Sequence, residues 1–119
     1  MEIDPVSRPL IRDIVMTINF FKRKEKKLIE AIKEDPQTAE NYLQLGKLYF
    51  LNGDYVDASD AYQRGLKIDP RDVSMLFNYA VNREAQNEQD GAKELYLEIL
   101  SIDPNNKATQ ERLDKITDF

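Results

Sequence analysis

The side chains of this chain that could do acid–base chemistry are mostly carboxylates. The 119 residues include no histidine and no cysteine, which removes the usual general base and the commonest transition-metal ligand together. Asp54, Asp57 and Asp60 fall at the predicted start of a helix, where negative charge stabilises the helix dipole. No glycine-rich phosphate loop and no metal-ligand spacing is present. The sequence therefore predicts a protein that is not an enzyme and holds no cofactor or metal.

A fixed period of 34 residues determines where these side chains lie. It is marked by three Asp-Pro pairs, at residues 35–36, 69–70 and 103–104. When residues 39–72 are aligned with residues 73–106, large residues match large ones and small residues match small ones. A period of this size indicates a repeated structural unit, which builds a surface for recognition rather than a buried pocket.

Composition restricts the class of protein further. Hydrophobic residues make up 41% and charged residues 33% of the chain, as in a soluble helical domain. The net charge of −5 is divided into +3 for residues 1–33 and −8 for residues 34–119, so the repeat region does not favour nucleic acid. No apolar run approaches the roughly 20 residues that cross a bilayer, and the first residues lack the basic region of a signal peptide. We expect a cytoplasmic protein.

Each repeat divides into two helical stretches. Tyr42, Leu45 and Tyr49 lie on one face of a helix that Asn52-Gly53-Asp54 stops. The residue before each repeated proline is pushed out of helical geometry, which ends the second stretch. The expected helices cover residues 9–34, 39–52, 55–68, 73–86, 89–102 and 107–117.

Four segments follow from this division. Residues 39–72 form repeat one, residues 73–106 form repeat two, and residues 107–119 form a capping helix. Residues 1–38 fit either a degenerate repeat or one long helix, because the small-residue positions of a repeat fall there on Arg12 and Lys24.

The pattern of the repeats resembles the tetratricopeptide repeat family. The matching residues of repeat one are Tyr42, Leu45, Gly46, Tyr49, Ala58, Tyr62 and Pro70. Repeat two departs from the pattern at Arg83, where an aromatic residue is usual. The resemblance implies an all-α solenoid of helical hairpins, a fragment of a right-handed superhelix. It also implies a non-catalytic adaptor or scaffold that binds another protein.

In the resembled family, the first helix of each repeat lines a concave groove that holds a peptide or a partner helix. The groove positions that we select in this chain are Leu43, Lys47, Phe50, Leu51, Phe77, Asn78, Val81, Glu84 and Ala85. Their apolar members lie off the predicted core stripe, which favours an interaction site. Two interpretations stay open, namely that a partner fills the groove or that the chain's own N-terminal helix covers it.

One subclass of the family grips the C-terminal carboxylate of chaperones with a clamp of lysine, arginine and asparagine. Asn78 and Arg112 match two clamp positions. Leu43, Lys47 and Ala108 occupy the other three, where a basic residue, asparagine and lysine are expected. This mismatch argues against a chaperone-binding clamp.

The basic run at residues 22–27 allows further interpretations. The simplest is the solvated face of a helix. Alternatively, residues 10–27 tether the chain to an anionic membrane surface by inserting Ile14, Ile18, Phe20 and Phe21. Nucleic-acid contact is not expected, because no interleaved aromatic platform accompanies the run. A second alternative function is structural, with the N-terminal helix assembling a homo-oligomer.

Overall fold

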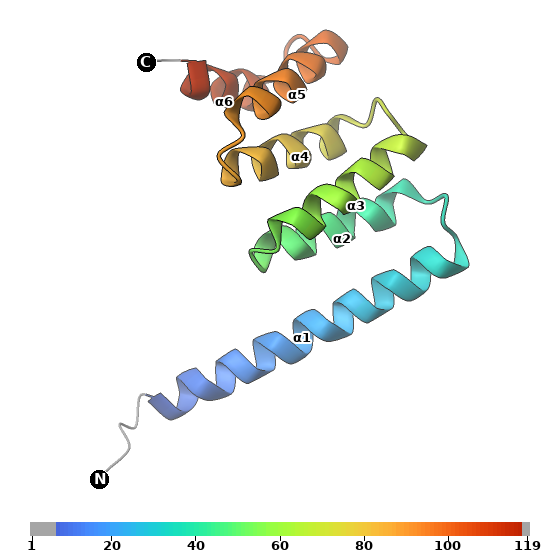
Figure 1. Ribbon diagram of the computed structural model, residues 1–119, viewed down its shortest axis with the longest axis vertical. Helices are drawn as coiled ribbons and strands as arrows, with labels where there is room; N and C mark the ends of the chain where they lie inside the picture. The colour runs from blue at the N-terminus through green and yellow to red at the C-terminus, as the bar shows by residue number, and fades with distance from the viewer. Residues whose placement is uncertain (1–6, 118–119) are drawn as a thin grey trace.

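The computed structural model describes residues 7–117, and the outer ends of the predicted segments 1–38 and 107–119 lie outside that range. The described chain is all-α, as predicted, with short turns between its helices (Figure 1). The helices are α1 (Ser7–Glu34), α2 (Ala39–Leu51), α3 (Tyr55–Ile68), α4 (Val73–Ala85), α5 (Gln89–Ile102) and α6 (Lys107–Thr117).

The helices stack in chain order. α2 pairs with α3 and α4 pairs with α5, while α3 joins the two hairpins by packing on α4. α1 packs on α2 at one end of the stack, and α6 packs on α5 at the other (Figure 1). Because each helix touches mainly its neighbours, the molecule is a flat stack of 60 × 44 × 21 Å.

The hairpin turns depend on residues that accept left-handed backbone geometry. Gly53 has φ of +80° and Asn87 has φ of +59°, a region that glycine and asparagine enter most readily. Asp72 begins α4 by accepting a hydrogen bond from the backbone N–H of Met75 at 3.1 Å, which satisfies an otherwise unpaired donor of the first turn.

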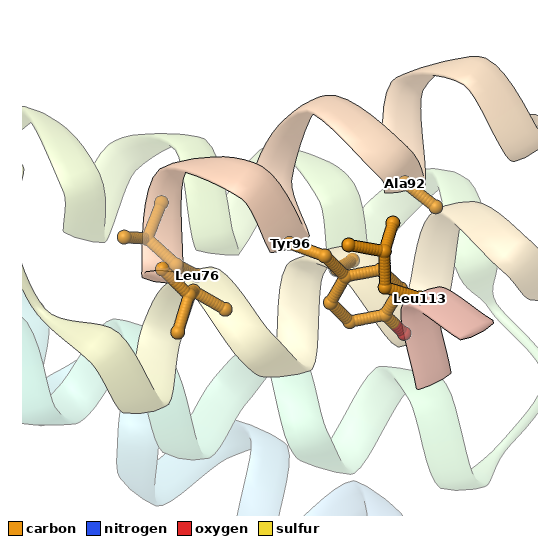
Figure 2. Close-up of a cluster of buried hydrophobic side chains, with 6 residues drawn as sticks. Leu76, Ala92, Tyr96 and Leu113 are labelled. Atoms are coloured by element: carbon orange, nitrogen blue, oxygen red, sulfur yellow. The ribbon is translucent and has the colours of Figure 1, made fainter. Parts of the chain in front are cut away.

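The core of each hairpin is built around one tyrosine of the second helix. Tyr62 and Tyr96 are fully buried, and Figure 2 shows Tyr96 of α5 between Leu76 of α4 and Leu113 of α6. A Cβ atom added at Gly46 would lie 2.6 Å from Cδ1 of Tyr62. Only a small residue therefore lets α2 approach α3 so closely.

Arg83 packs where the family pattern has an aromatic residue. Its guanidinium lies 5.1 Å from the ring centroid of Tyr79, an attractive cation–π arrangement. Its Nη2 donates to the Tyr79 hydroxyl at 2.9 Å, and its Nη1 donates to Glu88 at 2.5 Å. The flat guanidinium thus replaces an aromatic ring by stacking on Tyr79.

α1 is one continuous helix from Ser7 to Glu34. Only its C-terminal half packs on α2, where the ring centroids of Phe21 and Tyr49 lie 6.1 Å apart. Tyr49 Oη also donates to the Glu25 carboxylate at 2.7 Å. Residues 11–20 are exposed throughout and extend beyond α2 (Figure 1).

The first prediction tests the close contact between helices. Ala58 is fully buried, whereas Val56, two residues earlier on the same helix, is 75% exposed. Ala58→Arg forces a charged side chain into a tight contact, so we expect it to cost more than about 3 kcal/mol of unfolding free energy. The matched variant Val56→Arg should change it by less than about 0.5 kcal/mol. Chemical denaturation measures both, and equal effects of the two variants would contradict this packing.

Candidate functional site

The predicted groove residues divide into three groups in the structure. Lys47, Leu51 and Ala85 are exposed. The half-buried group consists of Phe50, Phe77, Asn78, Val81 and Glu84. Leu43 is buried. The surface of the first helices α2 and α4 therefore presents most, but not all, of the selected side chains to solvent.

Leu43 corrects the sequence analysis. It is only 5% exposed and belongs to a core cluster with Ala58, Tyr62, Met75 and Tyr79. α2 packs on both α3 and α4, so its buried surface is wider than the single stripe that we assumed. Leu43 holds the two hairpins together and is not available to a partner.

The two groove phenylalanines also contribute to packing. The ring centroid of Phe50 lies 5.6 Å from that of Tyr55, and the ring centroid of Phe77 lies 5.9 Å from that of Tyr96. Each ring thus contacts a tyrosine ring in a tilted arrangement and remains partly exposed. Replacing either phenylalanine would disturb the hairpin as well as the surface.

Two polar members of the groove, Glu84 and Asn78, already have partners within the chain. Glu84 accepts a hydrogen bond from the Tyr96 hydroxyl and lies 3.5 Å from Nε of Arg112. Burial of Tyr96, followed by its contact with Glu84, raises the pKa of the Tyr96 phenol above its usual value. Asn78 donates to the carbonyl of Ser74 at 2.8 Å. With Arg112 paired and Leu43 buried, these residues do not form a carboxylate clamp.

A cleft opens between α1 and α2, with a volume of about 320 Å³. Its lining consists of Lys24, Lys27, Leu28, Gln44, Lys47, Leu48 and Leu51. Leu51 is 82% exposed. Three leucines and three lysines with no carboxylate among them make the cleft apolar in part and strongly basic.

Sequence reasoning selected only Lys47 and Leu51 of this cleft. It did not select Lys24, Lys27 or Leu28, and the simplest interpretation of residues 22–27 was a solvated face. In the sequence, Lys24 stands where the other repeats carry a small residue, but this position was not connected with a cleft.

The carboxylates at the start of α3 remain ordinary surface groups. Asp57 is exposed in the first turn, and Asp60 forms an exposed ion pair with Arg64 at 3.1 Å. Between residues 7 and 117, no group of three or more potential metal ligands comes together. Within the same part of the chain, no helix is long and apolar enough to cross a membrane.

Two family models of the tetratricopeptide repeat match the chain, one at residues 39–72 and the other at residues 74–106. The chain belongs to the tetratricopeptide repeat family. Both models describe repeats, and together they include α2 to α5.

Relatives of this tetratricopeptide protein match it over part of their length. The uncharacterized protein ycf37 of Pyropia yezoensis is 35% identical over 78 residues, which are 66% of this chain and 44% of that protein. The small glutamine-rich tetratricopeptide repeat-containing protein 2 of Mycosarcoma maydis is 34% identical over 55 residues, which are 46% of this chain and 16% of that protein. The chain thus spans less than half the length of either relative.

Solved tetratricopeptide domains share the fold. The first such domain of Spaghetti (RPAP3), solved with the HSP90 peptide SRMEEVD, superposes with a TM-score of 0.78 at 16% identity. The match includes 88% of this chain and 83% of that one. At this identity the likeness shows the arrangement of helices alone.

Tyr49 makes the docking of α1 sensitive to alkaline pH. Burial, and then the hydrogen bond and charge of Glu25, raise the pKa of Tyr49 above its ordinary value of 10.0. The folded-state pKa therefore exceeds the unfolded one, so this contact stabilises fully below pH 10 and is lost as the pH rises above it.

Removing the Tyr49 hydroxyl should loosen α1 without unfolding the repeats. We expect Tyr49→Phe to keep the ring contact with Phe21 but to cost about 0.5–1.5 kcal/mol through the lost hydrogen bond. Amide hydrogen exchange should become faster in residues 21–34 and stay unchanged in α4 and α5. The difference from the wild type should shrink above pH 10. Exchange that speeds up equally in all helices would show that the contact does not act locally.

Proposed function

We propose that this chain is a non-catalytic adaptor that binds another protein through the exposed surface of its first helices. The observation that carries the proposal is a straight apolar row on α4, formed by Phe77, Val81 and Ala85. These residues recur every four positions, so they lie one above the other on a helix. Each remains at least partly exposed.

The α4 row fits the anchors of a partner helix or an extended peptide. Phe50 on α2 adds a neighbouring apolar side chain that is also partly exposed. An apolar strip of this kind accepts side chains spaced at i, i+3 or i+4 and i+7 of an amphipathic helix. Lys47 and Glu84 at the edges would contribute more to orientation than to affinity.

A chaperone C-terminal peptide is not the ligand that we propose. The RPAP3 domain is solved with an HSP90 peptide, but identity to that domain is low. In this chain Leu43 is buried and Arg112 pairs with Glu84, so a terminal carboxylate would find few free cationic groups on α2, α4 and α6. An apolar contact with the α4 row is the better-supported mode.

Two substitutions on the α4 row test this function. Val81→Lys combined with Ala85→Lys places two charges one turn apart on the proposed contact surface. Because apolar burial contributes about 25 cal/mol per Å², we expect affinity for a captured partner to fall by about tenfold or more. The control, Val56→Lys with Leu97→Lys, changes two exposed apolar residues of the second helices α3 and α5.

The experiment first captures proteins on the wild-type chain and then measures the affinity of each for all three forms. The helical spectrum and the melting temperature of the double variant should stay close to those of the control. Equal affinity for the wild type and a folded double variant would contradict a binding site on the α4 row.

A further inference from the structure

The cleft between α1 and α2 is the vacant position of a first helix. With the 34-residue period, residues 21–34 of α1 correspond to α3, the second helix of repeat one. On α3 the residues Ala58, Ala61 and Tyr62 are at most 2% exposed, because α2 packs over that helix. Their equivalents on α1 are Lys24, Lys27 and Leu28, which line the open cleft. Nothing from residues 7–117 fills the place that α2 takes in repeat one.

The N-terminal half of α1 matches the first helix of a repeat but packs on no other helix of the described chain. Ile11, Ile14 and Val15 correspond through the period to Leu45, Leu48 and Tyr49 of α2, yet all three are exposed on the free half of α1. This half, residues 7–20, is about as long as α2 and α4, which have 13 residues each. Ile11, Ile14 and Val15 are each more than half exposed, and an apolar face of this kind favours a covering partner.

Asn19 marks the point where the free half begins. It corresponds to Gly53 and Asn87, the two residues whose positive φ turns the chain between paired helices. In α1 this residue is helical. The helix therefore continues straight and carries residues 7–18 away from the cleft beside residues 24–28 of the same chain.

We propose that residues 7–18 of one copy occupy the cleft of a second copy, and reciprocally, in a symmetric dimer. The first and second helices of a repeat run antiparallel. A two-fold axis that passes near residues 20–21 of both copies makes their two α1 helices antiparallel in the same way. Exchange of an identical element across such an axis makes a closed, isologous interface. This dimer goes beyond the proposed adaptor function, and it leaves the α4 row free.

Charges and volumes are compatible with this pairing. About the two-fold axis, residue 13 of one helix lies level with residue 28 of the other, so Asp13 comes close to Lys27. Arg12 occupies the position of Gly46, but it faces Leu28 instead of the larger Tyr62, which leaves room for a longer side chain.

A membrane surface fits the free half less well. Ile18 and Phe20 are both exposed, but they lie about 160° apart around the helix, so one flat surface does not cover both. The acidic remainder of the chain, with a net charge of −8 over residues 34–119, would also be repelled by anionic lipids.

Engineered cysteines test the exchange in the full chain, which has none of its own. Arg12→Cys with Leu28→Cys places thiols at the equivalents of Gly46 and Tyr62, which touch in repeat one. Along one straight helix these positions lie about 24 Å apart, too far for a disulfide within the chain. We expect oxidation to give a covalent dimer of twice 13.9 kDa. The control pair, Arg12→Cys with Lys26→Cys, should give much less because Lys26 does not line the cleft.

The other outcomes of this experiment overturn the proposal. A disulfide within one chain would show that residues 7–18 fold back at Asn19 onto their own cleft. A yield no higher than that of the control would show that the cleft does not take this segment.

Substitutions at Asn19 provide an independent readout that leaves Leu28 intact. Asn19→Gly favours the turn and weakens the continuous helix, whereas Asn19→Ala favours the helix. We expect the dimer dissociation constant from sedimentation to be at least about tenfold higher for the glycine variant than for the alanine variant. Equal constants would contradict the exchange, as would an alanine variant that stays monomeric and binds vesicles containing phosphatidylserine.

Discussion

The close approach of a small residue to a buried tyrosine is the contact on which the repeat fold depends. Gly46 faces Tyr62 in the first hairpin, and Ala80 packs with Tyr96 in the second. The ring fills the space between the helices only because the opposite side chain is small or absent. At the corresponding positions the N-terminal segment has Arg12 and Leu28. This segment forms one continuous helix through Asn19 and no hairpin.

The two ends of the stack differ for this reason. At the C-terminal end, Leu113 of α6 is buried against the cluster around Tyr96 (Figure 2), so the last hairpin is covered. At the N-terminal end, α1 covers part of α2 but leaves Leu51 open beside three lysines. A repeat array is stabilised by the contacts between neighbouring units. The open end therefore has the strongest physical requirement for a further helix, and the α4 row remains for a different partner.

The fold could be predicted because its signals are local. The Asp-Pro pairs and the turn residues Gly53 and Asn87 end the helices close to where the sequence indicates. The surface could not be predicted to the same extent. Burial of Leu43 depends on α4 crossing α2, and the stacking of Arg83 depends on the position of Tyr79. Predicting the cleft would require knowing that α1 continues straight through Asn19, a residue type that is compatible with both a turn and a helix.

Amide hydrogen exchange of the 119-residue chain at increasing protein concentration tests most directly whether the cleft between α1 and α2 is an unfilled first-helix position. If a second copy fills it, exchange should slow with concentration in residues 11–20 and 44–51, because both segments become covered. Exchange in α5 and α6 should not change, since these helices are packed within each copy. Protection of residues 11–20 that is the same at every concentration would contradict the account.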